Sequence, residues 1–216
     1  MKRLCLLFVV LLGACGRTAP PSPPPATSSS AYLDYSGRDD ALSGGVKMIP
    51  ITTPKGTFHV WTKRVGNNPA VMVLLLHGGP AAGHEYMEAF DSYFPKAGIE
   101  FYYYDQLGSF FSDQPNEPSL WEIYVPMQGP SELGASGKLE HWDRSKDLSA
   151  IAMPTLVIGA RYDTMDPAHM EMMSKQVQHG RYLFCPNGSH LAMYDDQKAY
   201  FDGVVKFIED VDSGRF

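Results

Sequence analysis

Three short motifs in this chain contain the residue types that acyl-transfer chemistry needs. The turn at residues 77–80, His-Gly-Gly-Pro, follows an aliphatic run and can present backbone N–H groups to a developing negative charge. Asp163 and His190 lie in two later loops, each after an apolar run. An acid that orients a histidine, and a histidine that takes a proton, belong to a catalytic triad. Asp163 and His190 are therefore a candidate acid and base, and Gly78 with Gly79 a candidate oxyanion loop.

The nucleophile that such a site needs is missing from the sequence. A serine nucleophile of this kind sits on a Gly-x-Ser-x-Gly turn between a strand and a helix, and no such pattern occurs in the 216 residues. Ser109, Ser131 and Ser136 neither follow a buried strand nor open a helix, so none is predicted to replace it. His77 is expected to support the glycine turn rather than to carry protons. The plain alternatives are a turn aspartate at Asp163 and a surface histidine at His190.

The elements that must position these residues alternate between strands and helices. Strands are expected at Val46–Thr52, Thr57–Val65, Ala70–Leu76, Ile99–Tyr104, Pro154–Gly159 and Arg181–Cys185, and helices at His84–Phe94, Ala168–Val177 and Gln197–Val211. The first two strands flank a Pro-Lys-Gly turn and predict a hairpin. The remaining alternation predicts an α/β fold with a mostly parallel sheet and flanking helices.

The middle of the chain is too short for a complete fold of this type. Only 47 residues separate Gln106 from Pro154, and they are rich in Gly, Pro, Ser and charged residues. One strand–helix–strand unit needs roughly 30 residues or more. The segment therefore cannot hold a nucleophile strand, its helix, a cap and a further unit, and we predict that the fold is internally truncated. Loss of the nucleophile strand would leave an apolar edge beside Val71–Leu76, unless Thr155–Ile158 closes against it.

At this point the residues resemble a known family. Leu76-His-Gly-Gly-Pro80 and Phe101-Tyr-Tyr-Tyr-Asp-Gln106 resemble the N-terminal part of the proline iminopeptidases, a serine-peptidase branch of the α/β-hydrolases. The segments Met127–Glu132, Trp142-Asp143 and Gly159–Pro167 resemble the C-terminal part of that family. The resemblance covers residues 44–121 and 126–210, and it implies an α/β-hydrolase fold.

The resemblance also implies an activity and roles for site residues. The family releases an N-terminal residue, usually proline, from short peptides, so a small peptide is the implied substrate, and no cofactor is implied. Asp163 would be the triad acid, His190 the general base, and Gly78 and Gly79 the oxyanion loop. Because the nucleophile is absent, we expect the chain as printed to lack useful peptidase activity, and whether it is an enzyme stays open. Asp105 and Gln106 are expected to be structural.

Three alternatives remain beside this interpretation. The chain could be a non-catalytic surface lipoprotein that keeps part of the fold as a binding module. It could derive from another α/β-hydrolase, such as an esterase. The printed sequence could also be a gene-model or sequencing artefact of a gene that encodes an intact enzyme.

The N-terminal residues predict export. Lys2 and Arg3 precede an apolar run that is too short to span a bilayer, so residues 1–15 are expected to be a signal peptide. Leu-Gly-Ala-Cys at its end resembles a bacterial lipoprotein cleavage site, which makes Cys15 the expected lipidation site. Residues 16–43 begin with a Pro/Ser-rich stretch and are expected to be a linker, and residues 44–216 the truncated hydrolase domain. The mature chain would then be anchored in the membrane of the cell envelope.

Composition limits the other functions. The formal charge of −6 provides no basic patch, so nucleic acid is not an expected partner. Of the three cysteines, Cys5 leaves with the signal and Cys15 is the lipidation site, so Cys185 has no partner for an internal disulfide. It is expected to be a small apolar residue at the end of a strand. The spacing of Cys and His predicts no metal site.

Overall fold

The computed structural model describes Tyr32 and residues 45–68, 70–78, 82–116, 126–127, 129–130 and 135–216. The predicted signal peptide, the lipidation site Cys15 and most of the linker lie outside these residues, as do Gly79 and Ser131. Within the part of the chain that the structure describes, no helix is long and apolar enough to cross a bilayer.

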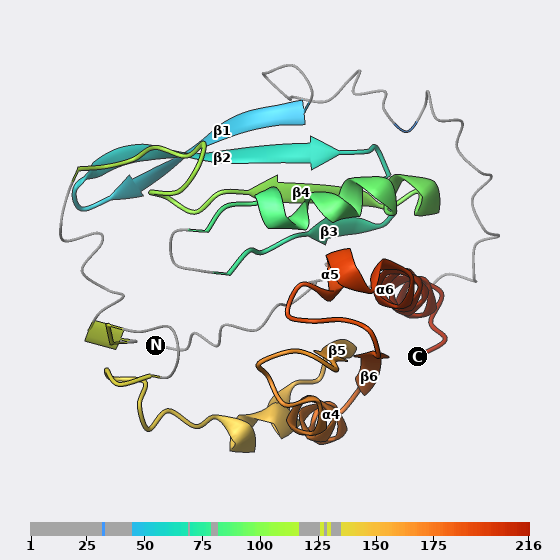
Figure 1. Cartoon of the computed structure of the whole chain (residues 1–216). Helices are drawn as coiled ribbons and strands as arrows, with labels where there is room; N and C mark the ends of the chain where they lie inside the picture. The colour runs from blue at the N-terminus through green and yellow to red at the C-terminus, as the bar shows by residue number, and fades with distance from the viewer. Residues whose placement is uncertain are drawn as a thin grey trace.

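The N-terminal half forms a four-stranded sheet in the order β1-β2-β4-β3 (Figure 1). Strands β1 (Val46–Thr53) and β2 (Gly56–Val65) form the predicted antiparallel hairpin. Strand β4 (Glu100–Tyr104) pairs antiparallel with β2 and parallel with β3 (Met72–Leu74). The hairpin follows from alternating β-branched residues on either side of a turn-forming Pro-Lys-Gly segment.

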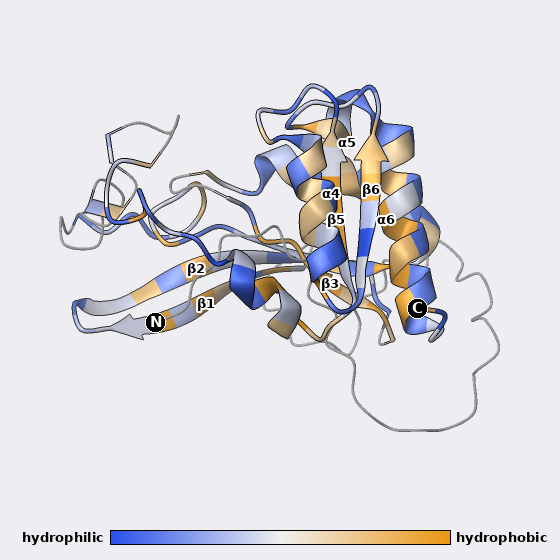
Figure 2. Ribbon diagram, turned by 90° about the horizontal axis from the view of Figure 1, so that it is seen from below, coloured by the Kyte–Doolittle hydropathy of each residue, from blue (hydrophilic) through white to orange (hydrophobic). Residues whose placement is uncertain are grey.

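The C-terminal half is a separate parallel pair of strands, β5 (Thr155–Ala160) and β6 (Gly180–Cys185). Helices α4 (Pro167–Gln176) and α6 (Gln197–Asp212) flank this pair on opposite sides (Figure 2). Helix α4 starts as its sequence predicts, because Asp166 accepts a hydrogen bond from the Ala168 amide and Pro167 occupies the first turn. A short helix, α5 (Ala192–Asp195), precedes α6.

The sheet is interrupted between β3 and β5. Of the two outcomes that the sequence left open, an apolar edge beside Val71–Leu76 or closure by Thr155–Ile158, closure does not occur among the described residues, since β5 pairs with β6 and β3 with β4. Strand β3 is also shorter than predicted. With a partner on one side, only Met72–Leu74 satisfy strand pairing, and the side chains of Met72 and Leu74 remain 39% and 41% exposed.

One apolar core nevertheless joins the two halves. Residues 84–94, predicted as a helix, instead form the 3-10 helix η2 (Glu85–Ser92), which is followed by the 3-10 helix η3 (Pro95–Ala97). Helix α6 packs against this segment through Phe201, whose ring stacks on Tyr93 with centroids 4.0 Å apart and an angle of 7°. The Tyr93 hydroxyl also donates to Oε1 of Gln197 at 3.0 Å. The two halves therefore share one core, although no described strand of one half pairs with a strand of the other.

The C-terminal end of α6 is fixed by an ion cluster around Asp210. Its carboxylate accepts from Lys206 Nζ and from Arg181 at 2.7 Å each, and Arg215 lies 3.4 Å away. The hydrogen bonds from Lys206 and then Arg181 lower the pKa of Asp210 to about 2. Arg181 lies on β6, so this cluster ties the last helix to the second sheet.

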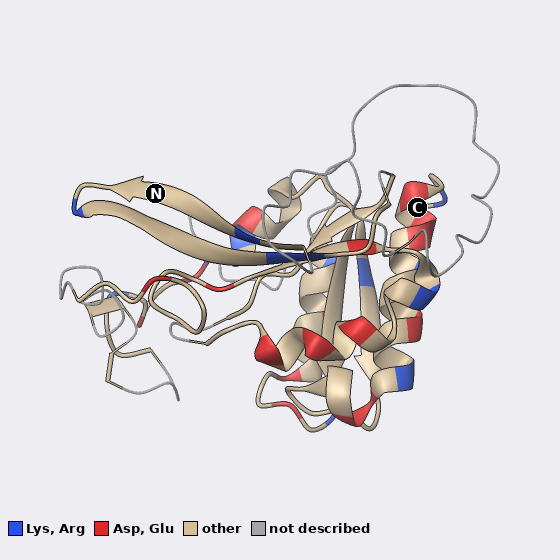
Figure 3. Cartoon of the chain, turned by 90° about the horizontal axis from the view of Figure 1, so that it is seen from above, with Lys and Arg blue, Asp and Glu red and all other residues tan. Residues whose placement is uncertain are grey.

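In the described part of the chain, the Lys and Arg positions are spread over several elements. Figure 3 marks them in blue on the β1–β2 hairpin and on the C-terminal helix, where acidic positions also occur. The remaining cysteine of the domain, Cys185, is buried with a free thiol, and burial raises its pKa to about 11. It is therefore the inert apolar residue that the sequence predicts.

Candidate active site

Asp163 and His190 meet at one end of the β5–β6 pair. Asp163 lies in the loop after β5 and His190 in the loop after β6, and parallel strands bring their carboxyl ends to the same edge of a sheet. His190 Nδ1 lies 3.0 Å from Oδ1 of Asp163. The Asp163 side chain is 13% exposed and that of His190 is 64% exposed. The acid is thus enclosed by the protein while the imidazole faces solvent.

The carboxylate of Asp163 is oriented by its own loop. Its Oδ1 also accepts from the backbone amide of Met165 at 3.1 Å and from the Thr164 hydroxyl at 3.3 Å. An Nδ1–H donated to this oxygen leaves Nε2 of His190 as the ring nitrogen that can accept a proton. This is the arrangement that a general base requires, although the catalytic roles of both residues remain a prediction.

Two aspartates that the sequence analysis missed hold the loop of His190. Asp195 accepts from the Ser189 amide at 3.0 and 3.2 Å and from the Ser189 hydroxyl, and these bonds lower the pKa of Asp195. Asp196 accepts from the Asn187 amide at 2.9 Å. Gly188 fits here because a Cβ would lie 2.7 Å from that of Ala192. The sequence signal for these two aspartates was an acidic pair that begins six residues after Ser189.

His77 supports the glycine turn, as predicted. Its Nε2 accepts from the Gln106 amide at 3.0 Å, so Nδ1 carries the proton and donates to the Gly78 carbonyl at 2.7 Å. The ring is buried and stacks on Tyr104 with centroids 5.0 Å apart. Both nitrogens of His77 are occupied by backbone groups, which fits a structural role.

The Gly78 amide, a candidate oxyanion donor, is already bonded. It donates to the Tyr86 hydroxyl at 2.5 Å. Burial raises the pKa of Tyr86, and the bond from Gly78 acts in the opposite direction. The Gly78 N–H can therefore reach an oxyanion only if Tyr86 moves, and Gly79 lies outside the described residues. The oxyanion role of this turn stays a prediction.

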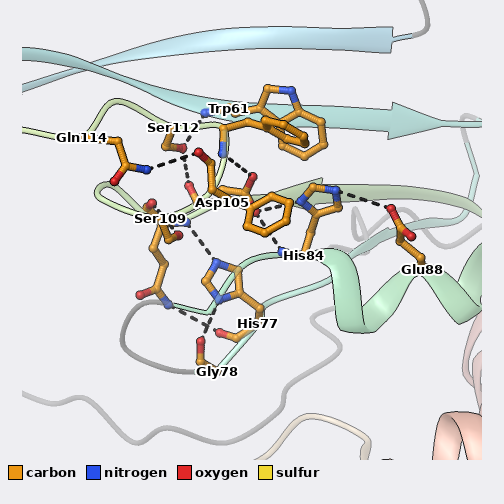
Figure 4. Close-up of polar contacts among 12 residues, drawn as sticks. Trp61, His77, Gly78, His84, Glu88, Asp105, Ser109, Ser112 and Gln114 are labelled. Carbon is orange, nitrogen blue, oxygen red and sulfur yellow. Dashed lines mark hydrogen bonds and ion pairs between the residues drawn. The ribbon is translucent and has the colours of Figure 1, made fainter.

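A buried carboxylate, Asp105, organises the next loop (Figure 4). Its Oδ1 accepts from both the backbone amide and Nδ1 of His84, at 2.8 Å each, and its Oδ2 accepts from the Phe111 amide at 3.2 Å. The His84 ring stacks on Trp61 with centroids 4.4 Å apart. The contacts confirm the predicted structural role of Asp105, while His84 was missed because it lay inside a predicted helix.

Ser109, Ser112 and Ser189 are not placed as nucleophiles. Ser109 is buried and donates to the Gln106 carbonyl at 2.9 Å, and Ser112 donates to the Asp105 carbonyl at 2.7 Å. Ser189, next to His190 in sequence, is bonded to Asp195. Across the described ranges, His190 makes no hydrogen bond to a serine hydroxyl, and no group of three or more His, Cys, Asp or Glu side chains could hold a metal ion.

Comparison with known proteins gives the family. No protein-family model matches the chain. The proline iminopeptidase of Elizabethkingia meningoseptica is 38% identical over an alignment of 297 residues, which takes in 78% of this chain and 100% of the relative. That of Flavobacterium johnsoniae is 36% identical over 295 residues, with 78% and 99% covered. This chain belongs to the proline iminopeptidase family.

Solved structures show the fold. A proline iminopeptidase from Mycobacterium smegmatis matches with a TM-score of 0.62 at 14% identity, covering 79% of this chain and 100% of that one. An esterase from Thermogutta terrifontis matches with a TM-score of 0.55 at 14% identity, covering 76% and 99%. The predicted α/β-hydrolase fold is therefore confirmed, here with an interrupted sheet.

The proline iminopeptidase relatives are longer than the part of this chain that aligns with them. An alignment of 297 residues with a chain of 216 residues must include a long stretch of the proline iminopeptidase relative that has no counterpart here.

Proposed function

We propose that this chain carries the acid and base of a proline iminopeptidase site but does not release N-terminal proline on its own. The observation that carries this proposal is the 3.0 Å contact between His190 Nδ1 and Asp163, formed in a chain without a Gly-x-Ser-x-Gly turn. By family, the substrate class is a short peptide with an N-terminal proline.

The chemistry explains why half a site is insufficient. In a serine peptidase, the histidine removes the proton of the serine hydroxyl, the serine oxygen attacks the carbonyl, and backbone amides stabilise the resulting oxyanion. His190 can accept a proton at Nε2, and Asp163 can stabilise the imidazolium that forms. Among the described residues, His190 makes no hydrogen bond to a serine hydroxyl, and the hydroxyls of Ser109, Ser112 and Ser189 are bonded elsewhere. Without the nucleophile the pair has nothing to activate.

The proposal predicts no enzymatic turnover by the purified mature protein. With a proline arylamide as substrate, we expect the release of the arylamine to equal that of a buffer blank, measured by absorbance. The matched control is His190→Ala, whose side chain is exposed and whose loss should not disturb folding. Turnover that is present in the natural chain and absent from His190→Ala would contradict the proposal.

A binding function is the second candidate, and the exposed imidazole next to an enclosed carboxylate is the feature that favours it. Saturable binding of a proline-containing dipeptide, measured by calorimetry and lost in Asp163→Asn, would support a binding module. If no such binding is found, the binding function is rejected and only the inactive-hydrolase interpretation remains.

We also propose that the protein is exported and anchored by lipid at Cys15, on the sequence features of residues 1–15. Several acyl chains on one cysteine give stable membrane association, whereas one does not. Expressed in a bacterium with a lipoprotein pathway, the chain should fractionate with membranes and gain the mass of a lipid group. Cys15→Ser should abolish both, and a membrane fraction unchanged by Cys15→Ser would contradict the anchor.

A further inference from the structure

The two parts of the candidate site are not joined by one continuous sheet. Gly78 follows β3 and the loop of His190 follows β6, and among the described residues no strand of the first sheet pairs with a strand of the second. Strand pairing holds neighbouring strands about 4.8 Å apart and so fixes the spacing of the loops at their ends. A different contact therefore sets the position of the Gly78 turn relative to the loop of His190.

A contact between α5 and η2 supplies this connection. Helix α5 directly follows the loop of His190, and it packs against η2. The hydroxyl of Tyr194 on α5 donates to the Glu85 carbonyl at the start of η2, at 3.4 Å. That carbonyl belongs to the peptide group that joins Glu85 to Tyr86. The bond therefore holds the backbone from which the Tyr86 side chain extends.

Tyr86 connects η2 to the glycine turn. Its hydroxyl accepts from the Gly78 amide at 2.5 Å, and its ring is partly buried against the apolar core. Burial, and then the electrostatic effects of Cys185 and Tyr86, raise the pKa of Tyr200, so Tyr86 also lies close to α6. Because the ring is held by the core, the position of its hydroxyl over Gly78 depends on the position of η2.

The neighbours of Tyr194 tie it to the loop of His190. Asp195, the next residue, accepts from the amide and the hydroxyl of Ser189, which directly precedes His190. Met193, the residue before Tyr194, is 4% exposed and belongs to the core that both halves share. A displacement of α5 therefore moves Tyr194 and the loop of His190 together.

We infer that Tyr86 and Tyr194 are positioning residues that couple the loop of His190 to the Gly78 turn. This inference rests on the proposed function, which assigns the two loops to one site. While Tyr194 holds η2, Tyr86 covers the Gly78 amide. A displacement of α5 releases η2, withdraws the Tyr86 hydroxyl and leaves the Gly78 N–H open to another acceptor. The second half of the molecule thus controls access to a donor in the first.

Hydrogen exchange of the Gly78 amide, followed by NMR in the mature chain, tests the coupling. Tyr86→Phe removes the acceptor, so exchange should become at least tenfold faster. Tyr194→Phe leaves that acceptor in place, and exchange should still become at least threefold faster because η2 is no longer held by α5. In the double variant the rate should equal that of Tyr86→Phe alone, since both tyrosines act through the same bond.

The matched control for Tyr194→Phe is Tyr182→Phe. The Tyr182 hydroxyl on β6 also donates to a backbone carbonyl, that of Pro167 at the start of α4, at 3.0 Å. Its loss removes the same kind of bond from the same half of the molecule. Gly78 exchange should stay unchanged in Tyr182→Phe, and an acceleration equal to that in Tyr194→Phe would overturn the inference.

The Leu75 amide provides an internal reference. It donates to the Tyr102 carbonyl at 2.9 Å, so its exchange reports opening of the first sheet rather than of the glycine turn. We expect its rate to stay unchanged in all four variants. If Leu75 accelerates as much as Gly78, the substitutions act by general destabilisation and the coupling is refuted.

The Ser189 amide reports the other end of the connection. Tyr194→Phe should speed its exchange at least twofold, because α5 loses its contact with η2. An unchanged rate at either Gly78 or Ser189 in Tyr194→Phe would show that the two loops are independent and would overturn the inference. Exchange requires no turnover, so the two proposals fail separately. Hydrolysis of a proline arylamide by the natural chain would contradict the proposed function and leave the coupling intact.

Discussion

Phe201→Ala should destabilise the folded chain by about 3–5 kcal/mol, the largest loss expected from a single apolar side chain. Phe201 is 1% exposed and lies in the apolar core, which is built from residues of both halves of the molecule. Its ring stacks on Tyr93 and meets Phe90 edge-on with centroids 5.0 Å apart. Because the halves share no sheet, removal of this ring weakens the apolar contact that joins them as well as leaving a cavity.

Urea unfolding followed by circular dichroism measures this loss, and a thermal scan should show a midpoint lowered by roughly 10 °C. Phe184→Ala is the matched control, since Phe184 on β6 is 42% exposed and its ring lies outside this cluster. A two-step transition in Phe201→Ala would show that the halves unfold separately. An unchanged midpoint would contradict the shared core.

Asp105→Ala should cost about 2–5 kcal/mol, because it leaves buried donors without an acceptor. The backbone amide and Nδ1 of His84 both depend on this carboxylate, and the Phe111 amide is a third donor. Asp105→Asn retains one acceptor oxygen and should lose less. Thermal and urea unfolding of the two variants, compared with the natural chain, measures the difference.

The chain contains its own control for this prediction. Asp113 accepts from the backbone amide of His59 at 2.7 Å and from its Nδ1 at 3.1 Å, the same pattern as Asp105 with His84. The His59 and Asp113 side chains are 49% and 41% exposed, so water can replace the lost acceptor. Asp113→Ala should therefore reduce stability far less than Asp105→Ala. Similar losses in both would show that burial does not set the cost.

The pattern of apolar and turn-forming residues predicted the hairpin, the positions of the strands and two of the helices. The β1–β2 turn and the start of α4 depend on residues next to each other in sequence, so the sequence analysis located them closely. Residues 84–94 were expected to be a helix but form a 3-10 helix, because apolar spacing of three and four residues suits both. Strand β3 was predicted too long, since its length depends on partners that apolar composition cannot reveal.

The face of α6 was only partly predicted. Helical spacing in Gln197–Val211 predicts one apolar face made of Tyr200, Val204, Phe207, Ile208 and Val211. The first four are buried and Val211 is partly buried, whereas the burial of Phe201 and Asp210 was not predicted. Phe201 is buried because α6 packs against the segment around Tyr93 as well as against β6. Asp210 is buried because Arg181 and Lys206 neutralise it, and Arg181 is distant in sequence.

The candidate acid and base were predicted from the sequence, but the hydrogen bonds that hold the loops around them were not. Asp163 and His190 were identified because both follow strands, and the structure brings them into contact. The bond from Gly78 to Tyr86 and the anchoring of the His190 loop by Asp195 and Asp196 were not predicted. These contacts depend on how the loops fold back, and residue type alone does not contain that geometry.

The bond between Tyr93 and Gln197 has a consequence for how the chain accommodates a change of length. These two residues are 104 positions apart in the sequence and are joined by a hydrogen bond. The chain between them can therefore be treated as one loop whose ends are held together. The entropy of closing a loop grows only with the logarithm of its length, and a doubling costs about 0.6 kcal/mol. Loss or gain of residues in the middle of this loop therefore changes the cost of joining its ends very little. A stretch in the middle of this loop can therefore be lost or gained at little cost in loop-closure entropy while Tyr93 and Gln197 stay in contact.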